Sequence, residues 1–302
     1  MLNYSMDPVC VVKKINLEIP SFIKNNSEEN IDWQTVNSFG EEWTKFNFFS
    51  EEEIKNAGDQ YFDILNKELL NKSSNVLDVG CGTGRWTKYL CDKVGFVEAI
   101  DPSEAVFQAS LLLKDKKNVR VTQASADNIP FANNSFDLVF SLGVLHHIPD
   151  TFEAMKKCVD KVKPGGYFLV YLYYNLDNRG LILKSLFILS NFLRLIVSKL
   201  PSVIKEILCD ALAVFLYMPL VFLSKLVEKT SLTNGLVKHI PLSYYRDKSF
   251  HIIRNDSLDR FGTPLEQRFS RVEIEKMLIE AGLKEIKFSE YEPFWHAIGR
   301  KI

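Results

Sequence analysis

The chain has 302 residues, of which 37 are basic and 38 are acidic, so its formal net charge is −1. This balance gives no general electrostatic attraction to nucleic acid, and the length suits one sizeable domain with an elaboration. Five scattered cysteines without a CxxC pair argue against a disulfide framework and against a zinc site, and they predict a reducing, cytoplasmic location.

The region 1–70 is predicted to be an aromatic-rich, helical extension that precedes the main fold. Residues 1–20 lack the basic and apolar segments of a signal peptide, so none is expected. Ser50 and Glu53 have the spacing of a capping box, which predicts a helix from Glu51 to Leu70. The aromatic residues between 31 and 50 either pack in the core or form a lid that excludes water from a bound ligand.

The most informative segment is NVLDVGCGTGRW, residues 75–86. It predicts a short apolar strand, a glycine-rich turn and the first turn of a helix. Glycines 80, 82 and 84 lack a Cβ, so the backbone can turn sharply and approach a ligand closely. The free N–H groups and the positive dipole end of the helix point at the same place, which suits a carboxylate. The spacing is GxGxG, not the GxGxxG of a dinucleotide fingerprint.

Four further strands follow, each leading into a helix or a turn. They are predicted at residues 96–100, 119–123, 136–141 and 167–173. This alternation predicts an α/β fold, with a doubly wound, mostly parallel seven-stranded sheet and helices on both faces. Residues 283–290 and 294–300 are predicted to supply the last two strands as a hairpin, with the final strand antiparallel. Ser270 and Glu273 predict a capped helix that precedes this hairpin and stops at Gly282.

Acidic side chains follow two of the predicted parallel strands. Asp101 is placed to accept hydrogen bonds from both hydroxyls of a ribose, although Asp-Pro-Ser is also a common helix start with Ser103 as N-cap. Asp127 can accept a hydrogen bond from an adenine amino group. Together with the glycine turn, these residues predict a nucleoside-containing ligand at the carboxyl edge of the sheet.

With these segments in order, the chain resembles the class I S-adenosylmethionine-dependent methyltransferases, in the small-molecule group that includes quinone-biosynthesis enzymes. The matching segments lie between residues 71 and 174 and are VLDVGCGTGRW, AIDPS, ASADNIPF, SFDLVFSLGVLHHIPD and VKPGGYFLV. The resemblance implies S-adenosyl-L-methionine as the cofactor and a small molecule as the methyl acceptor. It does not identify that acceptor.

The resemblance also implies which residues hold the cofactor, all of them near the carboxyl ends of strands. Those expected around its methionyl part are Asp78, Gly80, Cys81, Gly82 and Gly84. Those expected around its ribose, its adenine and its sulfonium are, in that order, Asp101 with Pro102, Ala126 with Asp127, and Ser141 with Leu142. Residues 71–178 would thus form the cofactor-binding half of the fold, and residues 269–302 would complete it.

An apolar insertion is predicted after the fifth strand, over residues 181–229 of a region that extends from 179 to 268. Most of its first helix is Leu, Ile, Phe or Val, with a narrow polar stripe of Lys184, Asn191, Arg194 and Ser198. We expect this stripe to face solvent or lipid headgroups and the apolar majority to face inward, as a cap over the acceptor. Pro201 is predicted to end this helix.

A second apolar run, residues 211–223, contains Pro219 and no charge. It is too short to cross a hydrocarbon core of about 30 Å, which takes roughly 20 apolar residues. Two helices this apolar are expected to cover the active site, to meet another subunit in a homodimer, or to contact the inner face of a membrane peripherally. The sequence leaves these three alternatives open.

The segment 241–264 is dense in aromatic and charged side chains. Because loops on a rigid scaffold often carry substrate contacts, we expect Tyr245 and Arg246 to bind the acceptor together with Tyr173, which follows the fifth strand. The alternative for the segment is a solvated connector.

Chemistry follows from the implied cofactor, whose activated methyl group is displaced in line by a nucleophile of the acceptor. An oxygen or carbon nucleophile must also lose a proton. His147 and His146, just past the fourth strand, are the candidate general bases, since imidazole titrates near neutrality. Their alternative role is packing or capping in that turn. No set of metal ligands is predicted.

Three functions are consistent with the sequence. The first is methyl transfer to an apolar or lipid-linked small molecule, which the insertion favours. The second is methyl transfer to a sugar or sugar nucleotide in polysaccharide assembly, which the polar segment favours. The third is a non-catalytic scaffold that binds the cofactor, although a scaffold does not need the glycine turn together with Asp101 and Asp127.

Overall fold

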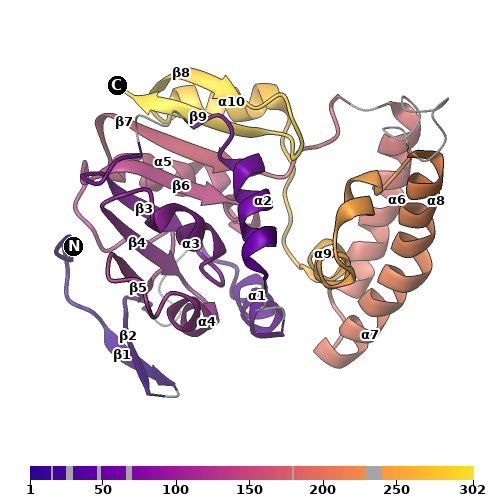
Figure 1. Cartoon of the computed structure of the whole chain (residues 1–302), viewed down its shortest axis with the longest axis horizontal. Coiled ribbons are helices and arrows are strands. Elements are labelled where there is room, and N and C mark those ends of the chain that lie inside the picture. The colour runs from indigo at the N-terminus through magenta and orange to yellow at the C-terminus, as the bar shows by residue number, and fades with distance from the viewer. Residues whose placement is uncertain (15, 25–29, 46–48, 66–69, 179, 229–239) are drawn as a thin grey trace. The chain divides into compact units, whose positions relative to one another are not determined.

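The computed structural model describes residues 1–302 except 15, 25–29, 46–48, 66–69, 179 and 229–239. The chain divides into two compact units, residues 1–177 with 265–302 (unit 1) and residues 178–264 (unit 2). Unit 1 contains a mixed sheet with helices on both faces, whereas unit 2 is helical (Figure 1). The predicted α/β fold is confirmed.

Five parallel strands form the centre of the sheet in unit 1. They are β3 (Asn75–Val79), β4 (Phe96–Asp101), β5 (Val119–Gln123), β6 (Phe136–Leu142) and β7 (Val162–Tyr171). The last two strands are β8 (Leu283–Phe288) and β9 (His296–Lys301), and β9 lies antiparallel between β7 and β8 as predicted. The strand order over these seven is β5-β4-β3-β6-β7-β9-β8. Strand order therefore reverses between β3 and β6, the position where open α/β sheets bind ligands.

The described sheet has nine strands, so the prediction of seven is wrong. The two additional strands, β1 (Cys10–Lys14) and β2 (Leu17–Ser21), form an antiparallel hairpin. The hairpin continues the sheet beside β5, where the N–H of Phe22 donates to the carbonyl of Gln123 at 2.8 Å. Burial explains this docking, since Ile19 is 3% exposed and Phe22 is fully buried.

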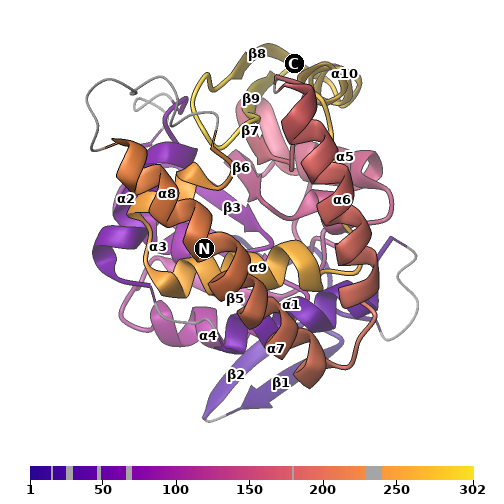
Figure 2. The ribbon, with the colours of Figure 1, turned by 90° about the vertical axis from the view of Figure 1, so that its right-hand side faces the viewer.

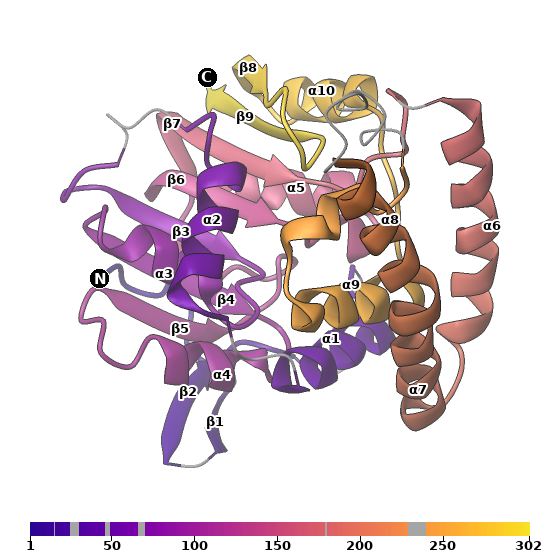
Figure 3. The ribbon, with the colours of Figure 1, turned by 45° about the vertical axis from the view of Figure 1, so that its right-hand side comes forward.

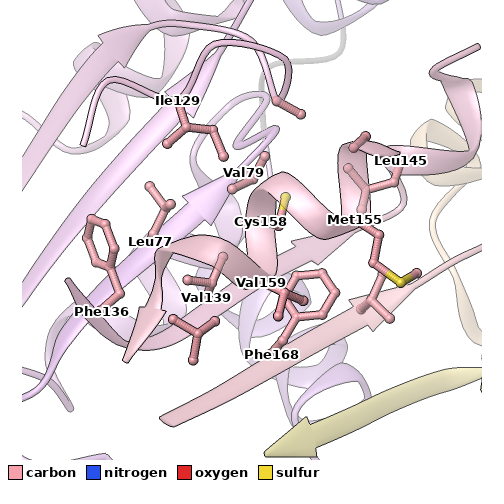
Figure 4. Close-up of a cluster of buried hydrophobic side chains, with 14 of the residues drawn as sticks. Leu77, Val79, Ile129, Phe136, Val139, Leu145, Met155, Cys158, Val159 and Phe168 are labelled. Carbon is pink, nitrogen blue, oxygen red and sulfur yellow. The ribbon is translucent and has the colours of Figure 1, made fainter. Parts of the chain in front are cut away.

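Helices cover both faces of the sheet because its central strands are apolar on both sides. One face carries α2 (Glu51–Tyr61), α3 (Arg85–Cys91) and α4 (Ala105–Leu112), and the other carries α5 (Thr151–Lys161) and α10 (Arg271–Glu280) (Figure 1). Figure 4 shows the core beneath α5, where Val79 lies next to Cys158 and where Leu77 and Met155 belong to the same cluster. The neighbouring Val76 packs on the opposite side. This alternation is the period-2 pattern of a strand.

Local capping signals hold in the structure, but one predicted helix is shorter than expected. The capping box is confirmed, with the N–H of Glu53 donating to Ser50 Oγ at 3.1 Å. The helix α2 ends at Tyr61, not at Leu70, because Phe62 turns away to stack on Tyr89 with ring centroids 5.3 Å apart. Residues 66–69 of the predicted helix lie outside the described part of the chain.

Unit 2 consists of helices that pack around one another. They are α6 (Leu181–Val197), α7 (Ser202–Leu212), the π-helical turn η3 (Ala213–Tyr217), α8 (Met218–Glu228), the short η5 (Ser243–Asp247) and α9 (Phe250–Gly262). Both α6 and α7 pack against α9 (Figure 2). Pro201 separates α6 from α7, as predicted.

The second apolar run lies within a longer helix, so the expectation that it is too short to cross a hydrocarbon core does not hold for the helix that contains it. The elements α7, η3 and α8 form one continuous helix of 27 residues, Ser202–Glu228. Proline lacks an N–H and its ring clashes with the carbonyl four residues earlier, which normally interrupts a helix. Here the wider π turn immediately precedes Pro219 and lets the helix continue. By length and composition alone, this helix is long and apolar enough to cross a membrane.

Candidate active site

The glycine turn after β3 has the backbone geometry that the sequence predicts. Gly80, Gly82 and Gly84 all have positive φ, between 52° and 83°. A Cβ added to Gly80 would lie 2.5 Å from the side chain of Val144, so no larger residue fits there. The N–H groups of Gly80 and Cys81 both donate to the carbonyl of Ile100, which joins the turns after β3 and β4.

Asp101 ties these two turns together through its carboxylate. One oxygen accepts the N–H of Gly82 at 2.9 Å, and the other accepts the N–H and the hydroxyl of Ser103 at 2.9 and 2.6 Å. Burial raises the pKa of Asp101, and these hydrogen bonds oppose the rise. A carboxylate has about four acceptor positions, so three are occupied and about one remains for a ligand hydroxyl. Ser103 Oγ accepts the N–H of Ala105 at 3.1 Å, but α4 begins at Ala105 with Glu104 as its N-cap, so the alternative of Ser103 as N-cap is wrong.

Asp78 presents a buried acidic oxygen without a hydrogen-bond partner. Its Oδ2 accepts from Thr87 Oγ1 at 2.7 Å, whereas its Oδ1 has no donor among the described residues. The residue is 1% exposed, and burial raises its pKa to about 7. An unpartnered buried acceptor is costly unless a ligand donates to it. The position fits the ammonium group of an amino-acid-like ligand.

The remaining predicted cofactor residues lie at the same edge of the sheet. Ser141 donates from its hydroxyl to the carbonyl of Val79 at 2.9 Å and so joins the ends of β6 and β3. Cys81 packs against helix α4, where burial raises the pKa of its thiol. Asp127 forms an ion pair with Lys157, which leaves fewer acceptor positions for an adenine amino group. The others, partly or fully buried, are Pro102, Ala126 and Leu142.

Helix α1 (Trp33–Lys45) contacts several of these turns from one of its faces, and it packs against α4 (Figure 3). A Cβ on Gly82 would lie 3.5 Å from the indole nitrogen of Trp43, and one on Gly40 would lie 3.4 Å from Ser103 Cβ. The ring of Phe39 lies 4.7 Å from that of His147. Position 43 lies on the same side of the helix as positions 39 and 40, because it follows them by four and three residues. The aromatic segment therefore lies over the glycine turn, the Asp101 turn and the histidine turn.

The two histidines differ in their hydrogen bonds. His146 accepts the N–H of Tyr173 on Nδ1 at 3.4 Å, so its proton sits on Nε2, and its ring stacks on Tyr173 at 3.9 Å. Burial lowers the pKa of His146 far below its usual value, so the ring stays neutral. His147 Nδ1 lies 2.7 Å from the carbonyl of Leu265 and must donate to it. The Nε2 of His147 therefore carries a lone pair and is the better placed acceptor of a proton.

Sequence reasoning missed the segment 265–269, which lies beside this histidine turn. Its backbone is hydrogen-bonded to two different turns. The N–H of Gln267 donates to the carbonyl of His146, and the N–H of Phe269 donates to the carbonyl of Tyr173. Arg268 lies over the ring of Tyr173 at 5.0 Å and pairs with Glu266 at 2.8 Å, where Glu266 is 1% exposed on its side chain. Glu266 and Arg268 are two residues apart, a spacing that puts both on one face of an extended segment. That spacing was the only feature of the sequence that could have indicated this pair.

The predicted acceptor residues belong to different units. Tyr173 lies in unit 1 beside both histidine rings, at 3.9 and 5.6 Å. In unit 2, Tyr245 contacts Tyr217 at 5.7 Å, and Arg246 pairs with Glu228 at 3.0 Å. A role for Tyr245 and Arg246 at the acceptor stays a prediction. In the described part of the chain, no group of three metal-ligating side chains comes together.

Comparison with known proteins identifies the domain that contains these turns. A family model described as a methyltransferase domain matches residues 77–170, from β3 to β7. These residues are a class I S-adenosylmethionine-dependent methyltransferase domain. The family and the cofactor predicted from the sequence are confirmed, and S-adenosyl-L-methionine is the cofactor of the methyltransferase domain.

Two relatives that match this region of the chain are named for different methyl acceptors. The demethylmenaquinone methyltransferase of Geobacillus sp. (strain WCH70) is 34% identical over 110 residues, which cover 34% of this chain and 47% of that protein. The phosphoethanolamine N-methyltransferase 2 of Caenorhabditis elegans is 35% identical over 102 residues, covering 32% of this chain and 23% of that protein. The chain therefore spans less than half the length of these relatives.

One solved structure has a similar fold over most of the chain. A possible exported protein from Bordetella parapertussis matches with a TM-score of 0.50 and 15% sequence identity, covering 89% of this chain and 80% of that one. At this identity the likeness concerns the fold alone.

Proposed function

We propose that this protein transfers the methyl group of S-adenosylmethionine to a small-molecule acceptor that is apolar or lipid-linked. The observation that carries the proposal is the combination of the glycine turn, the unpartnered Oδ1 of Asp78 and the partly filled carboxylate of Asp101. A buried acid with no donor is costly to keep in a fold unless a ligand completes it. A non-catalytic scaffold has no need of all three features.

The residues present fit the cofactor at its methionyl part and at its ribose. Asp78 would accept from its ammonium, and Asp101 would accept from a ribose hydroxyl. When bound, the cofactor supplies an electrophilic methyl whose bond to sulfur breaks as the acceptor's lone pair forms the new bond. The role of the protein is then to align the acceptor, and such alignment contributes about 7 kcal/mol or more to catalysis.

Helix α1 is proposed to act as the lid of this site. Trp43 and Phe39 put aromatic rings beside Gly82 and His147, and Gly40 lets the helix approach Ser103 closely. Excluding water in this way strengthens the electrostatic contacts inside and prevents side reactions. Trp43 also lies under the guanidinium of Arg85 at 5.2 Å, which holds the helix over the glycine turn.

His147 is proposed to take the proton that an acceptor hydroxyl or carbon acid loses. The carbonyl of Leu265 fixes its tautomer, so that Nε2 can receive the proton and Nδ1–H stabilises the resulting cation. His146 is less suited, since its Nδ1 already accepts from Tyr173 and burial disfavours its protonated form. His146 would position Tyr173 by stacking.

Internal pairing in unit 2 favours an apolar acceptor over a sugar. The sugar alternative depended on the polar residues between 244 and 260. In the structure these are engaged within unit 2, with Arg254 on Asp210 and Tyr217 on Asp256 at 3.1 Å. Among the relatives, a demethylmenaquinone methyltransferase is named for a quinone and a phosphoethanolamine methyltransferase for a polar amine, so the shared region is compatible with either class.

Labelled cofactor tests the proposal. The purified protein is incubated with S-adenosylmethionine carrying an isotopic methyl group and with separate organic-solvent and aqueous extracts of bacterial cells. We expect label in a product of the organic extract, and much less of it with the Asp101→Ala variant at the same concentration of cofactor. Label only in the aqueous extract would refute the apolar acceptor, and no label in either would refute the activity.

The proposed location of the protein in the cell follows from the proposed acceptor. An apolar acceptor resides in a membrane, so a cytoplasmic enzyme must reach the inner face of that membrane to use it. Peripheral contact through residues 181–229 would serve this purpose. A homodimer through the same residues is the competing proposal, and the next experiment separates the two.

A further inference from the structure

The polarity of unit 2 is inverted relative to a soluble helical bundle. The predicted orientation, with the polar stripe outward, is wrong. Arg194 is 5% exposed and donates to the carbonyls of Thr263 and Pro264 at 3.0 and 2.9 Å and to Asn191 at 2.9 Å. Ser198 is 3% exposed. Only Arg194 and Ser198 of the stripe are buried, whereas Lys184 and Asn191 are half-buried. Arg194 can be inside because the carbonyls that follow α9 supply the acceptors that a buried guanidinium requires.

Further polar groups are paired inside the same unit. Ser257 donates to the carbonyl of Cys209 at 2.7 Å, and Ser224 donates to the carbonyl of Val221 at 2.7 Å. Tyr217 donates to Asp256. The interior of unit 2 is thus held by hydrogen bonds as well as by apolar packing.

The outer face of unit 2 carries the apolar side chains instead. On α6 the exposed ones are Leu181, Leu186, Ile188, Leu189, Phe192, Leu195 and Ile196. On the helix Ser202–Glu228 they are Val203, Ile204, Ile207, Leu208, Val214, Phe215, Leu216, Met218, Phe222, Leu223 and Leu226. The largest are 63–80% exposed, at Phe192, Phe215 and Phe222. We call these residues the apolar face. Exposed apolar side chains in this number, on two helices that both pack against α9, mark an interaction surface.

The apolar face has the length and the one-sidedness of a membrane-docking surface. Exposed positions from Val203 to Leu223 contain no charge, and at 1.5 Å per residue they extend over about 30 Å. The opposite side of this helix packs against α9, whose charged residues include Arg254, Asp256 and Arg260. A helix covered on one side by a polar partner suits a bilayer surface, with its apolar face in the acyl region, better than a full crossing.

Charges beside the apolar face favour lipid headgroups over a second copy of the chain. The acidic Asp210 and Glu228 are paired with Arg254 and Arg246. Three lysines show no ion pair within the described residues, namely Lys184, Lys199 and Lys225. Two copies meeting face to face would enclose these lysines without an acidic partner, since Asp210 and Glu228 are already paired. Anionic headgroups neutralise them instead.

We propose that unit 2 is a monotopic bilayer-docking module, in which the apolar face of α6 and Ser202–Glu228 enters one leaflet and the three lysines bind anionic headgroups. The inference deepens the proposed function, since an enzyme held on the bilayer can draw an apolar acceptor from it. Its support, however, comes from unit 2 alone.

Vesicle flotation tests the proposal with the 302-residue chain. The probes are vesicles of phosphatidylcholine alone and vesicles with added phosphatidylglycerol. We expect wild-type protein to float with both, at least tenfold more strongly with the anionic vesicles at low salt. Phe215→Ser with Phe222→Ser should lower the partition at least tenfold on both, and Lys199→Glu with Lys225→Glu should remove only the anionic preference. Both pairs of positions are exposed, so the fold is expected to survive.

A matched control and an independent readout keep the outcome interpretable. Val272→Ser with Ile279→Ser removes two equally exposed apolar residues from α10 of unit 1 and should not change flotation. Cofactor affinity should be unchanged in every variant, which separates this inference from the proposed function. Wild-type protein that stays at the bottom of the gradient with both vesicles overturns the proposal. So does a wild-type dimer in sedimentation that Phe215→Ser with Phe222→Ser makes monomeric without any flotation.

Discussion

Replacing Asp101 by alanine tests how the cofactor site is built. Three donors already occupy this carboxylate, at 2.6–2.9 Å, so about one acceptor position remains for a ribose hydroxyl. One charge-assisted hydrogen bond contributes about 1.5–3 kcal/mol. At about 1.4 kcal/mol per tenfold, Asp101→Ala should raise the Kd for the cofactor by roughly 10- to 150-fold. Two lost bonds, as the sequence alone predicts, would raise it by more than about 150-fold.

Calorimetric titration with S-adenosylmethionine and with its demethylated product measures this change. Ser103→Ala removes one internal donor and leaves the carboxylate, so it should raise the Kd only a few-fold. Asp137→Ala is the matched control, because Asp137 also accepts a backbone N–H, that of Asn75 at 2.8 Å, but where β3 begins. It should lower the melting temperature without changing the Kd. An unchanged Kd in folded Asp101→Ala would refute the assignment of Asp101 to the ribose.

Three further predictions follow from buried groups around the site and in unit 2. His147→Ala should lower kcat by about 100-fold with little effect on cofactor affinity. His146→Ala should mainly raise the KM for the acceptor, because His146 positions Tyr173. Wild-type turnover in both variants would exclude both histidines as the base. Trp43→Ala should speed cofactor dissociation about tenfold in stopped flow, and an unchanged rate would contradict the lid. Burial raises the pKa of Asp256 from 3.8 to about 6, so between these pH values the native state holds a proton that the unfolded state has lost, and stability falls with rising pH by about 3 kcal/mol. In urea unfolding at pH 4 and pH 7, Asp256→Asn should remove about 3 kcal/mol of this loss and leave the part that the raised pKa of Asp78 contributes, and a loss as large as in the wild type would refute the assignment.

Much of the methyltransferase domain could be predicted from the sequence because its signals are local. The glycine turn needs positive φ at Gly80, Gly82 and Gly84, and only glycine adopts such conformations without strain. The capping boxes at Ser50 and Ser270 each involve residues three apart. Signals of this kind are complete within a few residues, so the sequence states them in full.

Contacts between distant segments could not be read in this way. The hairpin β1–β2 joins the sheet through Ser21 and Gln123, and Leu265 reaches His147 across 118 positions of the sequence. Likewise, the contact between Trp43 and Gly82 depends on where α1 crosses the strand ends. An aromatic residue in a helix is equally compatible with a core and with a lid until its neighbours are known.

The insertion shows most clearly how local signals differ from contacts between distant segments. The sequence by itself determined that α6 has a polar stripe and an apolar majority, because the 3.6-residue period sorts side chains onto two faces. Only the tertiary structure decided which face is inside. Arg194 is buried because the carbonyls of Thr263 and Pro264, about 70 residues away, accept its hydrogen bonds at 2.9–3.0 Å. Periodicity fixes the faces of a helix, but the partner that satisfies a buried polar group fixes their direction.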